Sequence, residues 1–153
     1  MRTKINTIVI GSDHAGFKLK EFIKNYLLLN YPSFTIVDIG TNSEESCDYP
    51  DFANIVANRL KIRKDDDGSI GILICGTGIG MSIAVNRYRH IRGALINDEF
   101  TAKLAREHNN ANVLIFGARV VKNDLVIKCI DTFLATEFDM KSLRHLRRLS
   151  KIS

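Results

Sequence analysis

Five short apolar runs recur along the chain, and most of them are rich in β-branched residues. They are Ile5–Ile10, Thr35–Ile39, Ile70–Cys75, Gly93–Ile96 and Asn112–Phe116. Continuous runs of this length predict strands that are buried on both faces, as in a parallel sheet covered by helices.

The segments between these runs carry apolar residues three to four positions apart, which is the spacing of an amphipathic helix. This spacing predicts helices across Phe17–Leu27, Phe52–Leu60 and Leu125–Leu134. A further helix is predicted from about Glu99 to Glu107, with Asp98 as its N-cap. Asn123 or Asp124 is the expected N-cap of the helix predicted across Leu125–Leu134.

Strands that alternate with helices predict the α/β class, with a parallel sheet between two layers of helices. Ligands of such folds gather at the carboxyl ends of the strands. Neither a repeat nor a linker divides the sequence. We therefore expect a single domain over residues 1–153, with a basic helix or tail from about residue 139.

The composition is that of an ordinary globular protein, with 45% hydrophobic and 25% charged residues among 153. The apolar runs are too short to span a bilayer, and the N-terminus carries no signal-peptide pattern. Three cysteines, none at metal-ligand spacing, favour neither a disulfide framework nor a metal site. These features predict a cytoplasmic protein without a membrane partner or a bound metal.

The net charge of +5 is concentrated at the C-terminus. Five Lys or Arg and no acidic residue lie between Met140 and Ser153, which leaves 17 basic and 17 acidic residues elsewhere. Nucleic-acid-binding domains usually spread their basic surface over the fold, so we expect no nucleic-acid partner. The basic segment could grip a phosphate, decorate an exposed helix, or touch RNA weakly.

A glycine-rich loop, Cys75-Gly76-Thr77-Gly78-Ile79-Gly80, follows the third apolar run. Glycines let backbone N–H groups turn toward an anion, and the N-terminus of the next helix adds positive charge. The alternative is a dinucleotide-binding turn, but the spacing G-x-G-x-G does not match G-x-G-x-x-G. The loop therefore favours a small-anion or oxyanion cradle.

Cys75 is a candidate general base because a thiolate is favoured at the mouth of such a loop. A buried structural cysteine is the alternative, and it is the commoner fate of a lone cysteine. Cys47 and Cys129 receive no role.

Other polar residues follow the predicted strands or helices. Asp13-His14 could serve catalysis or cap a helix, and His108-Asn109 could form a polar helix C-cap. Arg119 lies just past a buried strand, where a phosphate would dock. His90 and His145 are expected at the surface or in the tail.

These motifs together resemble the type B ribose-5-phosphate isomerases and the related galactose-6-phosphate isomerase subunits. The resemblance runs from about Ile8 to Arg148. The matching stretches are Gly11–Phe17, Asp48–Pro50, Gly71–Ala84, His108–Asn109 and Asn112–Val121.

The resemblance implies a three-layer α/β/α sandwich with a five-stranded Rossmann-like parallel sheet. It also implies a homodimer, or a tetramer, whose active sites straddle a subunit interface. The implied activity interconverts ribose 5-phosphate and ribulose 5-phosphate without a metal or other cofactor.

The resemblance also assigns roles to particular residues. Cys75 would be the base, and backbone N–H groups from Gly76 to Gly80, through Gly78 and Ile79, would hold the enediolate oxygen. Opening of the sugar ring would involve Thr77 and His108, and contacts to the sugar would come from Asp13, Tyr49 and Asn109. The phosphate would be held by His14, Arg119, Arg144 and Arg148, some of them from the partner subunit.

Two departures from the family pattern bear on these roles. Some relatives have Glu in place of Met81 and lack the cysteine, so with Cys75 this chain resembles the thiol-base subgroup. Lys141-Ser-Leu143 stands where relatives have glycines, so Arg147 could replace one of the tail arginines. Alternative functions are isomerisation of a six-carbon sugar phosphate such as allose or galactose 6-phosphate, and non-catalytic sugar-phosphate binding.

Overall fold

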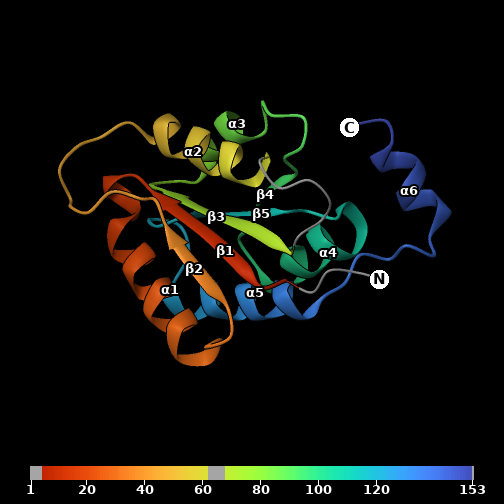
Figure 1. Cartoon of the computed structure of the whole chain (residues 1–153), viewed down its shortest axis with the longest axis horizontal. Coiled ribbons are helices and arrows are strands. Elements are labelled where there is room, and N and C mark those ends of the chain that lie inside the picture. Colours follow the sequence, from red (N-terminus) through yellow and green to blue (C-terminus); the bar gives the residue numbers. More distant parts are fainter. Residues whose placement is uncertain (1–4, 62–67, 153) are drawn as a thin grey trace.

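A five-stranded parallel sheet lies between two layers of helices (Figure 1). This arrangement is seen in a computed structural model that describes residues 5–61 and 68–152. It confirms the α/β/α sandwich predicted from the sequence. The N-terminal residues 1–4, which contributed to the prediction of a cytoplasmic protein, lie outside the described part of the chain.

The strand order places the most apolar runs in the middle of the sheet. The order is β2-β1-β3-β5-β4, and every neighbouring pair is parallel. The strands are β1 (Thr7–Ser12), β2 (Thr35–Asp38), β3 (Ser69–Cys75), β4 (Gly93–Leu95) and β5 (Val113–Gly117). β1 and β5 are buried throughout and β3 nearly so, whereas the edge strands β2 and β4 are mostly half-buried. Helices cover both faces of the three central strands, as their continuous apolar runs predict.

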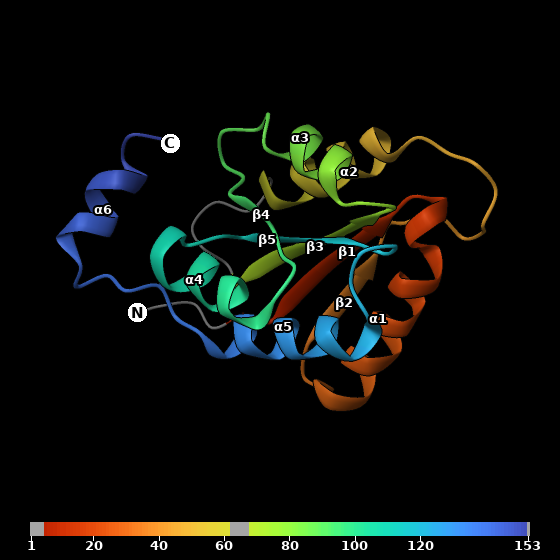
Figure 2. The same ribbon diagram turned by 180° about the vertical axis from the view of Figure 1, so that it is seen from behind.

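Alternate side chains of each central strand enter different cores. The helices are α1 (Phe17–Asn30), α2 (Tyr49–Lys61), α3 (Ile79–Val85), α4 (Glu99–Asn109), α5 (Asn123–Ala135) and α6 (Leu143–Leu149), and a 3₁₀ turn spans His14–Gly16. Ile8 and Ile10 of β1 pack with α1, α4 and α5, whereas Val9 packs with α2 and α3. Figures 1 and 2 show these two layers of helices on opposite faces of the sheet. The alternation follows from the two-residue period of a strand.

Several element boundaries differ from the sequence predictions. β1 begins and ends two residues later than expected: its first pair with β3 is Thr7 with Ser69, and Gly11 and Ser12 still pair with β3. Asp98 caps α4 as predicted, accepting a hydrogen bond from the Thr101 N–H at 2.7 Å. The prediction that Asn123 or Asp124 caps α5 is wrong, because the extended Lys122 occupies the N-cap position without a side-chain bond.

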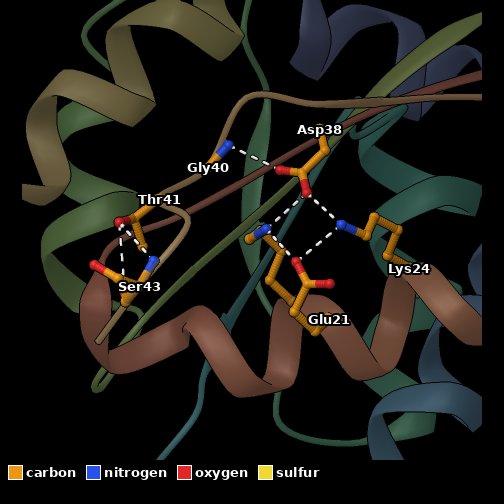
Figure 3. Close-up of polar contacts among 7 residues, drawn as sticks. Glu21, Lys24, Asp38, Gly40, Thr41 and Ser43 are labelled. Atoms are coloured by element: carbon orange, nitrogen blue, oxygen red, sulfur yellow. Dashed lines mark hydrogen bonds and ion pairs between the residues drawn. The ribbon is translucent and has the colours of Figure 1, made fainter. Parts of the chain in front are cut away.

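Lys20 of α1 is a fully buried lysine held by two carboxylates. Its Nζ lies 2.6 Å from Oδ2 of Asp38 and 2.7 Å from Oε1 of Glu21. Lys24 contacts the same two acids, as Figure 3 shows. Burial would raise the pKa of Asp38, but hydrogen bonds from Lys20 and Lys24 outweigh burial and lower it. The carboxylate is therefore ionised at neutral pH, and it balances the buried cation.

No helix in the described ranges is long and apolar enough to cross a membrane.

Replacement of Asp38 by alanine is expected to lower the free energy of unfolding by about 3 kcal/mol, because it removes the closest anion from a buried lysine. Lys18→Ala, which breaks the exposed pair with Glu44, is expected to cost less than about 1 kcal/mol. Urea unfolding of both variants at neutral pH measures the difference. Equal costs would contradict a stabilising role for the buried pair. The contribution of Asp38 to the free energy of unfolding should also depend on pH. It should be lost as the pH falls below about 3.8, the ordinary pKa of this carboxyl, and passes through its lowered pKa in the folded protein.

Candidate active site

The glycine loop connects the carboxyl end of β3 to α3, and it lies directly against the end of β5. Gly78 has φ +77°, in the left-handed region that residues with side chains rarely adopt. A Cβ on Gly117 would lie 2.5 Å from the backbone carbonyl carbon and oxygen of Thr77. Glycine at these two positions therefore allows the turn and its close approach to the neighbouring strand.

The Cys75 sulfur lies inside this loop. It accepts a hydrogen bond from the Gly78 N–H at 3.2 Å, and only 4% of the residue is exposed. Cys75 also packs with the core residues beneath α2 and α3. Cys75 therefore has a feature of each alternative from the sequence. It is part of the core, as a structural cysteine would be, and its sulfur faces the candidate anion cradle, as a base would.

Arg119 and Tyr49 pack against glycines of the same loop. The Arg119 guanidinium lies against Gly76, with Nη1 2.9 Å from the position that a Cβ on Gly76 would take. The Tyr49 ring covers Gly80 in the same way, with Cζ 2.5 Å from an added Cβ. Tyr49 itself belongs to the first turn of α2, whereas the sequence placed it just before that helix. The loop therefore contacts an arginine at Gly76 and an aromatic ring at Gly80.

Asp13 and His14 follow β1 at the same edge of the sheet. The buried Asp13 carboxylate accepts a hydrogen bond from the Gly16 N–H at 3.1 Å, which confirms the helix-cap alternative. The Asp13 N–H donates to the Ile74 carbonyl of β3, one residue before Cys75. The structure thus gathers Asp13, His14, Tyr49, Arg119 and the glycine loop at the carboxyl ends of β1, β3 and β5.

The other predicted site residues lie at the opposite edge of the sheet. α4 returns from the carboxyl end of β4 toward the amino end of β5, so His108 and Asn109 at its end are near that amino edge. Arg144 and Arg148 belong to α6, which packs on α4. In Figure 1 the strands end on the left, where α1 begins, and α6 lies on the right. The seven residues of β3 alone span about 20 Å.

His145 joins α6 to α4. Its ring stacks on His108, with 4.2 Å between ring centroids and 20° between ring planes. Loss of solvent lowers the pKa of His145, and nearby His108 and Arg144 lower it further. His145 lies in the tail, one of the two expected places, and α6 turns it inward so that it is buried. His90 is half-buried, with Nε2 2.8 Å from the Ala57 carbonyl oxygen.

Cys47 has a contact that the sequence did not reveal. Its backbone N–H donates to Nδ1 of His14 at 3.2 Å, and its sulfur lies 4.0 Å from the same nitrogen. The two residues are 33 positions apart, and no local pattern links them. Cys47 therefore orients the His14 ring, a role that only the three-dimensional structure shows.

Over the residues that the structure describes, no three His, Cys, Asp or Glu side chains form a group that could hold a metal ion.

Gly117→Ala is expected to lower the free energy of unfolding by about 1–3 kcal/mol and to displace the glycine loop, because the new Cβ meets rigid backbone. Gly76→Ala is the matched control: its Cβ meets the flexible end of Arg119, so the cost should be smaller. Chemical denaturation compares the two variants. A Gly117→Ala protein as stable as Gly76→Ala would contradict the close-approach argument.

Comparison with known proteins gives a family. A family model described as Ribose/Galactose Isomerase matches residues 8–152. The ribose-5-phosphate isomerase B of Escherichia coli is 39% identical, over 95% of this chain and 93% of the relative. A Rickettsia conorii protein whose name goes no further than sugar phosphate isomerase is 48% identical, over 97% of this chain and 99% of its own length.

Solved structures share the fold. A ribose 5-phosphate isomerase from Thermotoga maritima has 50% sequence identity and a TM-score of 0.87, covering 96% of this chain and 97% of that one. Ribose-5-phosphate isomerase B from Mycoplasma genitalium, solved with bound ribulose 5-phosphate, has 44% identity and a TM-score of 0.85, covering 95% and 93%. With a matching family model over nearly its whole length and such relatives on the same fold, the chain belongs to the ribose/galactose isomerase family.

Proposed function

We propose that this protein interconverts ribose 5-phosphate and ribulose 5-phosphate through an enediolate, with Cys75 as the base. The observation that carries the proposal is the sulfur of Cys75 within the glycine loop, 3.2 Å from the Gly78 nitrogen. The support from relatives is that those of Escherichia coli and Thermotoga maritima are named ribose-5-phosphate isomerases.

The proposed chemistry moves one proton between neighbouring carbons. The Cys75 thiolate takes the proton from C2 of the open-chain aldose, and the enediolate forms as negative charge develops on the C1 oxygen. The thiol then returns the proton to C1 while a proton moves from the C2 hydroxyl to the C1 oxygen, so C2 becomes the carbonyl of the ketose. Backbone N–H groups of residues 76–80 stabilise the oxyanion, and each such donor can contribute about 3–4 kcal/mol. The first turn of α3 supplies N–H groups that have no acceptor within the helix.

The phosphate end of the substrate is proposed to bind Arg119 and His14. Arg119 lies against Gly76, beside the loop, and a guanidinium can pair with phosphate oxygens in a bidentate manner. Binding energy from the phosphate would fix the orientation of the reacting carbons. Asp13 and Tyr49, which lie at the same edge, are the proposed contacts to the sugar.

The proposed site needs a second copy of the chain. Thr77 is part of the loop, but its proposed partner in ring opening, His108, lies at the amino edge of the sheet. Asn109, Arg144 and Arg148 lie on the same side as His108. We therefore propose a homodimer in which each site takes Cys75 from one copy and His108 and the tail arginines from the other.

An assay of purified protein tests the proposed activity. Ribose 5-phosphate is expected to have a higher kcat/KM than allose 6-phosphate or galactose 6-phosphate, and a chelator should leave the rate unchanged. A higher kcat/KM for either six-carbon substrate would instead assign the protein to hexose phosphates. Absence of turnover with all three would contradict an isomerase and favour a sugar-phosphate-binding protein.

Cys75→Ser is expected to lower kcat by about 10²–10⁴-fold, because serine cannot supply the thiolate base. The hydroxyl keeps an acceptor for the Gly78 N–H, so ribulose 5-phosphate should still bind, as titration calorimetry can measure. Cys129→Ala, at a buried cysteine of α5, is the matched control and should retain kcat. Full turnover by Cys75→Ser would exclude this residue as the base.

Mixed dimers test the shared site. Cys75→Ser and His108→Ala proteins are each expected to be nearly inactive. Heterodimers made by co-expression with two affinity tags should regain about half the wild-type rate, because one of their two sites is then intact. If both groups act from the same chain, the heterodimers would stay inactive.

A further inference from the structure

The buried ion pair of Lys20 and Asp38 lies at the start of a loop that leads to the candidate active site. Burial of a charged lysine is costly unless its partners are well placed. Lys20 is 0% exposed, and its Nζ is 2.6 Å from the Asp38 carboxylate. An apolar contact could also have stabilised the fold at this position. The ion pair therefore points to a further role, and the partners of Asp38 indicate what it is.

The two carboxylate oxygens of Asp38 have different partners. Oδ2 accepts hydrogen bonds from Lys20 and Lys24. Oδ1 accepts one from the Gly40 N–H at 3.0 Å, and Figure 3 shows Lys24 and Gly40 bound to different oxygens of this carboxylate. The stem of Lys20 also packs on Gly40, since a Cβ there would lie 2.6 Å from the Lys20 Cδ atom. Lys20 and Asp38 together fix the position of the Gly40 backbone.

The residues next to Gly40 tie the same point to β1. The Ile39 N–H donates to the Ile10 carbonyl, and the Thr41 N–H donates to the Ser12 carbonyl at 3.1 Å. Residues 42–46, which follow, are exposed. The ion pair therefore lies at the last tightly held point before an exposed stretch of chain.

The far end of this loop reaches two residues of the candidate site. The Cys47 N–H donates to Nδ1 of His14, and the ring of Tyr49 covers Gly80. We call residues Gly40–Asp48 the entry loop. A shift at Gly40 would move the start of this loop, and the end of the loop holds Cys47 against His14 and leads into Tyr49 at the start of α2.

We propose that the Lys20–Asp38 ion pair is a positioning device: it sets the course of the entry loop and thereby places His14 and Tyr49 for substrate binding. The proposal rests on the proposed function, because it assigns these two residues to the sugar-phosphate site. Lys20 and Asp38 act through the loop and touch no reacting atom. Cys75 and the glycine loop belong to β3 and α3, so the ion pair should affect binding more than proton transfer.

Lys20→Met tests the device, because methionine fills a similar space without a charge for Asp38. The expected result is a rise in KM for ribose 5-phosphate of about tenfold, with kcat changed less than about threefold. Lys24→Met is the matched control: Lys24 contacts the same two acids but is partly exposed, and the side-chain atoms nearest to a Cβ on Gly40 belong to Lys20, so KM should stay near the wild-type value. A Lys20→Met protein with unchanged KM, or one that loses only kcat, would overturn the proposal.

A second readout does not depend on activity. The rate at which a maleimide modifies each cysteine is measured by peptide mass spectrometry below the unfolding midpoint. Cys47 should react about tenfold faster in Lys20→Met, while the buried Cys129 should keep its wild-type rate. Parallel increases at both cysteines would indicate global opening and overturn the positioning role.

The two readouts separate this proposal from the proposed function. If the wild-type protein turns over no sugar phosphate, the proposed function fails, and Cys47 reactivity alone then tests whether the ion pair positions the loop. If Lys20→Met does not fold, Asp38→Asn takes its place. That variant keeps an amide oxygen for Gly40 and loses the charge facing Lys20, and the same two results are expected from it. Wild-type KM and Cys47 reactivity in Asp38→Asn would overturn the proposal.

Discussion

The candidate site depends on the approach of two backbones where β3 and β5 end. The strand register pairs Cys75 with Gly117. Because residue 117 has no side chain, the Thr77 peptide can lie against β5. Hydrogen bonds from the Ala118 and Arg119 N–H groups to the Cys75 and Gly76 carbonyls then hold the two segments together. The turn of the glycine loop, the bond to the sulfur and the position of Arg119 all follow from this contact.

The direction of the helices explains why the chemically interesting residues form two separate groups. In a parallel sheet each helix must return the chain to the amino edge before the next strand begins. Residues at the end of a strand or just after it therefore gather at one edge, as Cys75 and Asp13 do. Residues at the end of a returning helix, such as His108, lie at the other. Association of two copies can bring opposite edges together, which a single chain of this topology cannot do.

The fold followed from the sequence because its signals are local and repeat along the chain. The β-branched runs of the central strands and the helical spacing of Phe17–Leu27 each specify one element, and their alternation specifies the sheet. Element ends were less predictable. β1 extends to Ser12 because it pairs with β3, and Tyr49 lies inside α2, and neither fact is set by neighbouring residues alone.

Candidate site residues could be predicted where the pattern is contained in one short motif, but not where the arrangement depends on distant contacts. Residues 75–80 could be proposed as an anion loop because glycine content and position after a strand are visible locally. The bond from Cys47 to His14, the stacking of His145 on His108, and the burial of Lys20 against Asp38 join segments that are far apart in sequence. A buried lysine or histidine has no signature in a single sequence, because these residues are usually exposed.

The hydrogen bond from Gly78 to Cys75 also provides a spectroscopic handle. An amide that donates to a sulfur experiences a different field when that sulfur gains or loses a proton. Glycine amides resonate in an uncrowded region of a nitrogen–proton correlation spectrum. The Gly78 signal would therefore follow the ionisation of Cys75 directly, with no probe attached to the sulfur and no substitution in the loop.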